Sequence, residues 1–107
     1  MAYNFEKLEC WKNARELAIL VYDACDNYPK HEQFSLTSQS TRAVVSVAAN
    51  IAEGSSRSSK KDFCHFLEIA LGSAFELETL FEISLARKYI EIANKNDLSN
   101  LLELVVK

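Results

Sequence analysis

Few side chains in this 107-residue sequence have the type and spacing that acid–base catalysis or metal binding requires. The only two histidines are His31 and His65, and the stretch Asp62-x-x-His65 would place one carboxylate beside one imidazole on a helix. Di-iron helical bundles use two Glu-x-x-His motifs with further glutamates, so one aspartate version does not indicate a metal centre. The sequence also has no nucleophile motif, P-loop or dinucleotide-binding fingerprint. We therefore expect a protein that is not an enzyme and carries no metal or cofactor.

Positive charge is concentrated at one place, in and directly after the serine-rich stretch at positions 54–59. The three residues are Arg57, Lys60 and Lys61. Cationic side chains gathered in this way can contact the phosphates of RNA or DNA. The formal net charge is −3, from 12 basic and 15 acidic residues, so the chain has no general attraction for a polyanion and any such contact has to be local. The alternative is that the three cations only keep an exposed turn soluble.

A second polar group follows one side of the segment from Leu36 to Glu53. At 100° per residue its members fall within about 80° of one another. They are Gln39, Arg42, Ser46, Asn50 and Glu53. The rest of this segment is mainly valine, alanine and isoleucine, which indicates that it is covered on more than one side. Oligomerisation would supply the second covering surface.

We interpret this polar strip as a hydrogen-bonded network, either buried or at an interface. In it, Arg42 and Glu53 would meet partners such as Ser73 and Glu76 from the segment that follows. A buried charge without a partner costs several kcal/mol, so such a network would fix helix register or subunit geometry. The alternative is an ordinary solvated face.

The elements that have to position these residues are helices. The chain has only two glycines and one proline, too few for many hairpins and tight turns. Apolar residues recur every three or four positions from Phe5 to Tyr28, which predicts a first helix that ends at Pro29. Residues 30–35 then form the first turn. A second helix is expected from Leu36 to Glu53.

The boundaries of the later helices rest on capping residues and glycines. Gly54 is expected to take the left-handed conformation after the second helix, and Ser59 with Asp62 resembles a capping box for the third. The third helix should have about 26 to 28 residues. Gly72 lies inside it at a cost of about 1 kcal/mol, so we expect it to mark the close approach of another backbone. The alternative is a tolerated weak spot in the helix.

The last expected turn is at positions 94–96, and Asp97 would cap a fourth helix of about 11 residues. Short turns favour antiparallel neighbours. The predicted fold class is therefore all-α, an antiparallel up-down-up-down four-helix bundle, forming a single domain over residues 1–107. An apolar share of 49% is sufficient for one core.

The sequence also predicts a cytoplasmic location. No apolar run approaches the roughly 18 to 20 residues that span a bilayer, and the N-terminal stretch lacks the features of a signal peptide. Cys10, Cys25 and Cys64 are odd in number and widely spaced, which favours reduced thiols over disulfides or a zinc site.

Several motifs together are similar to a known family. They are Phe5-x-x-Leu8-x-x-Trp11, Tyr28-Pro29-x-x-Glu32, Leu36-Thr37-Ser38-Gln39, Arg42-Ala43, Ser46, Asn50-Ile51-Ala52-Glu53-Gly54 and Phe66-Leu67-x-x-Ala70-x-Gly72-Ser73-x-x-Glu76-Leu77. Over nearly its whole length the chain resembles the bacterial four-helix-bundle proteins encoded in 23S rRNA intervening sequences, also called S23-type ribosomal proteins. This resemblance implies a left-handed antiparallel bundle that assembles into a ring-like pentamer and has no known enzymatic activity.

A related branch of that family contains the accessory variability determinants of diversity-generating retroelements. The resemblance to this branch implies basic pentameric barrels that bind reverse transcriptase and nucleic acid. The present sequence departs from the branch in its acidic net charge and in Thr41, where many relatives have a second arginine. Ala48 also stands where a proline is frequent, which predicts a straighter second helix.

The functional prediction is a noncatalytic oligomeric scaffold or adaptor, forming a homopentamer, with an RNA, DNA or nucleoprotein partner. Arg57, Lys60 and Lys61 are the candidate nucleic-acid contacts. The alternative is a purely protein-binding helical module without any nucleic-acid contact. Neither a membrane nor a small-molecule substrate is expected.

Overall fold

The structure of the chain is a computed structural model that describes residues 5–106, apart from the side chain of Glu6. Its four α-helices are α1 (Glu9–Cys25), α2 (Leu36–Ser55), α3 (Lys60–Ala86) and α4 (Ile92–Val106). Two short 3-10 helices, Phe5–Lys7 and Lys30–Glu32, precede α1 and α2. Across this range no β-strand is formed, so the predicted all-α class with four helices is confirmed.

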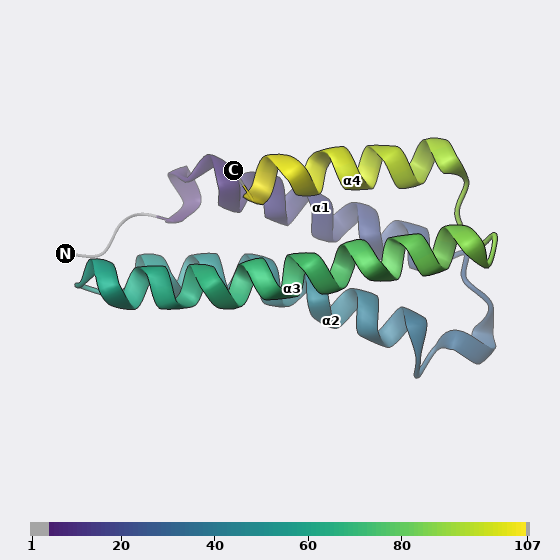
Figure 1. The fold of residues 1–107 in the computed structure, drawn as a ribbon, viewed down its shortest axis with the longest axis horizontal. Helices are drawn as coiled ribbons and strands as arrows, with labels where there is room; N and C mark the ends of the chain where they lie inside the picture. Colours follow the sequence, from purple (N-terminus) through teal and green to yellow (C-terminus); the bar gives the residue numbers. More distant parts are fainter. Residues whose placement is uncertain (1–4, 107) are drawn as a thin grey trace.

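The helices form a bundle in which each touches two others. α2 packs against α1 and α3, and α4 also packs against α1 and α3. Figure 1 shows the connection between α2 and α3 at one end of the molecule and the other two connections at the opposite end. The bundle is elongated, with principal dimensions of 45 × 25 × 18 Å.

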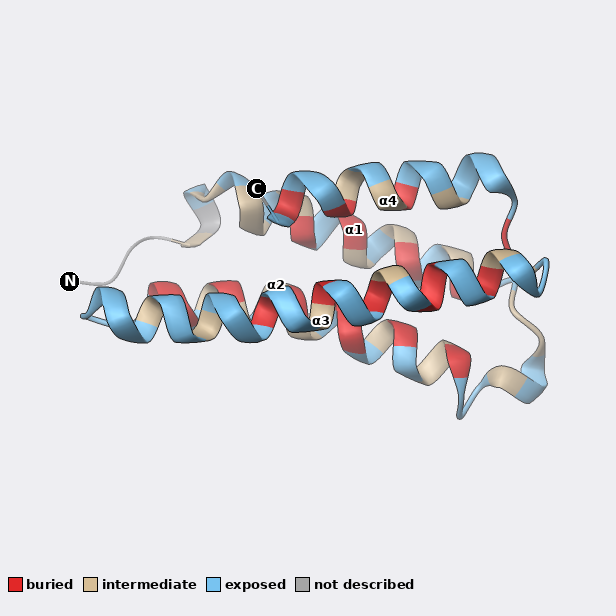
Figure 2. Cartoon of the chain, viewed as in Figure 1, coloured by how far each residue is buried: buried red, intermediate tan, exposed pale blue. Residues whose placement is uncertain are grey.

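Side chains from all four helices fill the core, and Figure 2 shows the buried positions along their facing sides. They include Leu17 and Val21 of α1, Val44, Val47 and Ile51 of α2, Leu77 and Phe81 of α3, and Leu98 and Leu102 of α4. Their three- and four-residue spacing is the periodicity that predicted the helices. Within residues 5–106, no helix is both long and apolar enough to cross a membrane.

The starts of α2 and α3 agree with the sequence, but only α3 is capped by the side chain of the residue that precedes it. The amide of Asp62 donates to Ser59 Oγ at 3.1 Å, which is the predicted cap of α3. Ser35 precedes α2, but its side chain makes no cap bond. Instead, the amide of Leu36 donates to Glu32 Oε1 at 3.4 Å.

Neither glycine has the role expected of it. α2 continues through Gly54 to Ser55, and Gly54 does not have a positive φ angle. A Cβ atom added there would lie 2.9 Å from Cβ of Phe66 and 3.0 Å from Cδ1 of Phe63, so Gly54 permits α3 to approach α2 closely. At Gly72 an added Cβ would meet no described atom within 4 Å. The predicted close approach therefore occurs at Gly54, and nothing in the chain makes it at Gly72.

The third turn comes earlier than predicted, so α4 is longer. α3 ends at Ala86, and Lys88 adopts a left-handed conformation with φ of 65°. The amide of Tyr89 donates to the Ser84 carbonyl and that of Lys88 to the Leu85 carbonyl, both at 2.9 Å, a pattern that usually has glycine at the left-handed position. Residues 94–96 consequently lie inside α4, which has 15 residues, and Asp97 is not its cap.

Candidate functional site

The centre of the predicted polar network is a hydrogen-bonded contact between α2 and α3. Ser46 Oγ and Ser73 Oγ share a hydrogen bond of 2.8 Å. Asn50 Nδ2 donates to the carbonyl oxygen of Ser46 at 2.8 Å and to its Oγ at 3.0 Å. All three side chains are half-buried, so the seam between these helices is polar but uncharged.

Glu53 has partners other than those predicted for it. Its carboxylate forms an ion pair with Arg57 at 3.6 Å and accepts a hydrogen bond from Ser56 Oγ at 3.3 Å. Both partners are close in sequence, three and four residues after Glu53. This spacing brings side chains to the same side of a helix turn. The expected contact with Ser73 or Glu76 is absent among the described residues.

The remaining members of the network, Gln39, Arg42 and Glu76, are exposed. None of their side chains forms a hydrogen bond or ion pair with another residue of the 5–106 range. Val44 and Val47 are buried, whereas Val45 points outward and is 45% exposed. The chain alone therefore leaves one side of α2 uncovered, and the covering of that side by oligomerisation stays a prediction.

The basic residues lie together around the connection between α2 and α3. The guanidinium of Arg57 is 4.7 Å from the centre of the Phe66 ring, besides its ion pair with Glu53. Lys60 and Lys61 are exposed in the first turn of α3 and make no ion pair within the described range. The structure therefore holds Arg57 in place and leaves the two lysines available to an anion.

Asp62 and His65, which the sequence spaces as one carboxylate and one imidazole, are also in the first turns of α3. The His65 ring is exposed and meets the Phe66 ring edge-on, with 5.5 Å between ring centres. No group of three or more potential metal ligands occurs among the described residues.

An apolar groove of about 400 Å³ lies where α4 ends beside α3. Its walls include Cys10, Val47, Ile51, Leu67, Leu71 and Val105. The groove arises because α3 has 27 residues and α4 has 15, so α4 cannot cover the first half of α3. The sequence could have indicated it, because the predicted third helix was already much longer than the predicted fourth.

Two cysteines, Cys10 and Cys64, line the same groove. α1 and α3 have no pair of Cα atoms within 8 Å, whereas a disulfide needs a Cα separation of about 4.4 to 6.8 Å. These thiols therefore cannot bridge within this structure.

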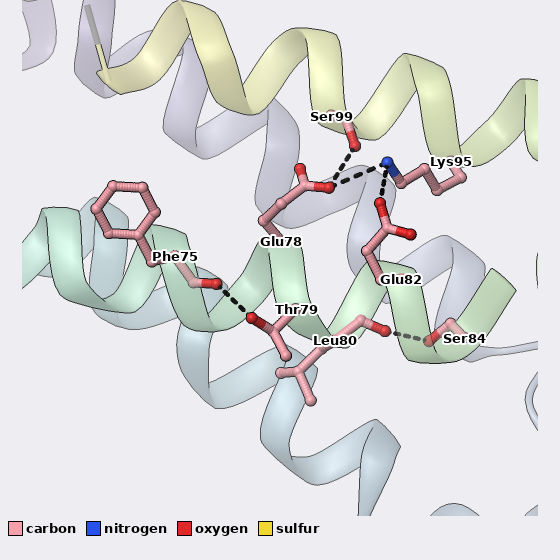
Figure 3. A network of polar contacts seen from close by, with 8 residues as sticks. All are labelled: Phe75, Glu78, Thr79, Leu80, Glu82, Ser84, Lys95 and Ser99. Carbon is pink, nitrogen blue, oxygen red and sulfur yellow. Dashed lines mark hydrogen bonds and ion pairs between the residues drawn. The ribbon is translucent and has the colours of Figure 1, made fainter. Parts of the chain in front are cut away.

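The charged contact between α3 and α4 was not predicted, because Lys95 was expected in a turn. Figure 3 shows Lys95 Nζ 2.7 Å from Glu82 Oε2 and 3.1 Å from Glu78 Oε2, while Ser99 Oγ donates to Glu78 at 3.2 Å. The hydrogen bonds to Glu82 and Glu78 raise the pKa of Lys95 above its ordinary value of 10.5. This cluster connects two helices and contains no free side chain aimed at a ligand.

At the end opposite the basic residues, Glu32 joins two connections. Tyr89 OH donates to Glu32 Oε2 at 2.9 Å, and His31 Nε2 lies 3.7 Å from the same oxygen. The hydrogen bond from Tyr89 is the main reason why the pKa of Glu32 is lowered. This cluster fixes the start of α2 against the turn that precedes α4.

Comparisons with known proteins agree with this architecture. The sequence model of the family described as 23S rRNA-intervening sequence protein matches residues 6–107. Among solved structures, the chain is similar to a protein of unknown function from the S23 ribosomal protein family of Bacteroides thetaiotaomicron, with 26% identity, a TM-score of 0.80 and coverage of 91% of each chain. None of the curated proteins matches the chain.

Proposed function

Because this chain belongs to the 23S rRNA-intervening sequence protein family, we propose that it is a noncatalytic oligomeric scaffold or adaptor that binds RNA, DNA or a nucleoprotein partner. Its protomers, each an antiparallel up-down-up-down bundle, would form a pentameric ring. Phosphate groups would be contacted by the basic residues of every copy. We place this activity in the cytoplasm, in keeping with the free cysteines.

The observation that carries the proposed assembly is the apolar surface left on the outside of α2 and α3. Phe75 is 68% exposed, and Val45, Ile69 and Ile83 are each at least 40% exposed. Large apolar side chains left exposed on two packed helices favour a protein–protein contact there. Association of several copies would cover it.

The basic residues support a phosphate-bearing partner. Lys60 and Lys61 are exposed and without an ion pair in the described chain, and Arg57 is held beside them against Phe66. One copy offers only a few contacts and has an acidic net charge of −3. An oligomer repeats the group in every copy, so that several weak contacts act on one nucleic acid at once.

The mass of the native assembly tests the first part of the proposal. We expect native mass spectrometry of the full chain to give five times the protomer mass of 12.1 kDa. A monomer at micromolar concentration would overturn the oligomeric scaffold.

The salt dependence of binding tests the second part, with a fluorescein-labelled single-stranded RNA as the probe. Fluorescence anisotropy should show affinity falling steeply between about 50 and 200 mM salt, because counterions compete for the phosphates. Replacing Lys60 and Lys61 together by glutamate should abolish binding and leave the assembly mass unchanged. The matched control is Lys30→Glu, an exposed lysine at the opposite end, which should bind like the parent chain. Equal binding by the double variant would refute the phosphate contact.

The apolar groove favours one alternative function, a module that binds only proteins. Its lining is largely apolar, and an apolar segment of a partner would dock there by excluding water. Affinity for such a partner should change little with salt and should fall when Leu71→Asp introduces a charge into the wall. Anisotropy measured with RNA and with the partner peptide separates the two functions.

A further inference from the structure

The outward faces of α2 and α3 carry two strips of three residues with the same spacing. The α2 strip consists of Arg42, Val45 and Ala49, and the α3 strip consists of Ile69, Gly72 and Glu76. Intervals of three and four residues place the members of each strip on one side of their helix. All six residues are exposed.

Two contacts between α2 and α3 determine which members of the strips lie at the same height along the bundle. Ser46 Oγ meets Ser73 Oγ, and Gly54 lies against Phe66, so later residues of α2 are opposite earlier residues of α3. With 1.5 Å of rise per residue, the strips match in three pairs to within about 3 Å of height. The pairs are Arg42 with Glu76, Val45 with Gly72, and Ala49 with Ile69.

Each of these pairs is complementary in charge or in size. The first pair matches a cation with an anion. The second sets the branched side chain of valine against glycine, and the third sets the methyl group of alanine against isoleucine. Within one chain the strips do not join, because no ion pair links Arg42 to Glu76 in the described range and no atom lies within 4 Å of a Cβ added to Gly72. Their complementarity is therefore unused by a single copy.

We propose that the α2 strip of one copy packs against the α3 strip of a second copy, and that this contact joins the protomers. The inference rests on the proposed function, since it requires an oligomer. A rotation about an axis parallel to the helices leaves heights unchanged, so Arg42 of one copy meets Glu76 of the next. Each copy contributes two different strips, which is a heterologous contact, the kind that forms a ring when its rotation closes.

The contact also gives a role to Gly72. Glycine weakens the interior of a helix, and no residue that the structure describes fills the space beside this one. In the proposed contact that space receives Val45 of the neighbouring copy. Backbones can then approach closely, and the Arg42–Glu76 ion pair is shielded from solvent.

A charge exchange tests the pairing, with oligomeric state read by native mass spectrometry. Arg42→Glu and Glu76→Arg should each raise the dissociation constant of the assembly about tenfold or more, because like charges would face each other. The double variant should restore assembly. Circular dichroism should show unchanged helix content throughout, since both residues are exposed and unpaired in the single chain. Arg15→Glu and Glu16→Arg, at exposed positions of α1, are the matched controls and should assemble normally.

A steric variant provides a second readout. Gly72→Leu places a side chain into open space, so the monomer should fold, while the space for Val45 of the next copy is lost. We expect monomers. If the parent chain is oligomeric and these variants leave its mass unchanged, the inference is wrong and the proposed scaffold stands. If the parent chain is itself monomeric, the proposed scaffold fails and this contact fails with it.

Discussion

α3 meets its two neighbouring helices in contrasting ways. Against α2 the backbones approach closely, because Gly54 has no side chain where Phe63 and Phe66 pack, and the uncharged Ser46–Ser73 contact lies further along. Against α4 the apolar core is shared, and beside it long charged side chains meet, with Lys95 between Glu78 and Glu82. What distinguishes the first contact is close packing, and what distinguishes the second is an ion-pair cluster at a partly exposed position.

This contrast shows which part of α3 is covered by its neighbours and which part is left exposed. α2 accompanies α3 from its first turns, whereas α4 reaches only as far as the groove beside Leu71. The α2–α3 contact should therefore be most sensitive to substitution at Gly54, where there is no space for a side chain. The α3–α4 contact should tolerate change, because its side chains can rearrange in solvent.

The largest expected effect is at Gly54. In Gly54→Ala the new Cβ would lie 2.9 Å from Cβ of Phe66 and 3.3 Å from the carbonyl oxygen of Phe63, so α2 and α3 must separate. We expect a net loss of about 1 to 2 kcal/mol in the free energy of unfolding, because overpacking outweighs the gain in helix propensity. Urea denaturation followed by circular dichroism measures this loss.

Gly72→Ala is the matched control for that substitution. Its Cβ meets open space, so at a dilution where the chain is monomeric it should gain about 1 kcal/mol from helix propensity alone. Equal effects of the two substitutions would show that the close approach at Gly54 has no energetic weight.

A smaller effect is expected from the hydroxyl pair in the α2–α3 seam. Ser73→Ala removes the hydrogen bond to Ser46 Oγ and should cost about 1 kcal/mol, because Ser46 is half-buried and keeps only its bond from Asn50. A double-mutant cycle with Ser46→Ala measures the coupling between the two hydroxyls. Thr79→Ala, whose hydroxyl bonds only to the carbonyl of Phe75 in its own helix, should show no coupling to Ser46. Additive effects of Ser46→Ala and Ser73→Ala would mean that the hydrogen bond between the two hydroxyls does not stabilise the fold.

The sequence predicted most of the helices, because their signals are local. Apolar periodicity, Pro29 and the Ser59 cap act within a few residues, and each helix of the structure overlaps its predicted range. The turn after α3 was missed because its left-handed position is occupied by Lys88, whereas this position is usually a glycine and is recognised by it. No glycine or proline follows α3 to act as a local stop signal, and Ile90, just beyond the turn, is buried.

The polar network was predicted in part, for a related reason. Helical spacing placed Ser46 and Asn50 on one side of α2, and the structure joins them to Ser73. Spacing alone does not say whether that side faces a helix of the same chain or its exterior. Arg42 and Glu76 are on the exterior, so any partner for them has to come from another molecule.

The smallest expected effect is at Lys95, the centre of the α3–α4 contact. Lys95→Met keeps the length of the side chain and removes its charge, and we expect a loss of about 0.5 to 1 kcal/mol because Glu82 is more than half exposed and solvent screens the pair. The pKa of Lys95 is raised in the folded chain, so its stabilisation is fully present below the unfolded pKa and is lost as pH rises through the folded one. The difference in melting temperature between the parent chain and Lys95→Met should therefore be larger at about pH 7 than at about pH 12, and should shrink with added salt. A difference that is the same at both pH values would mean that the methylene groups of Lys95, and not its charge, hold α4 against α3.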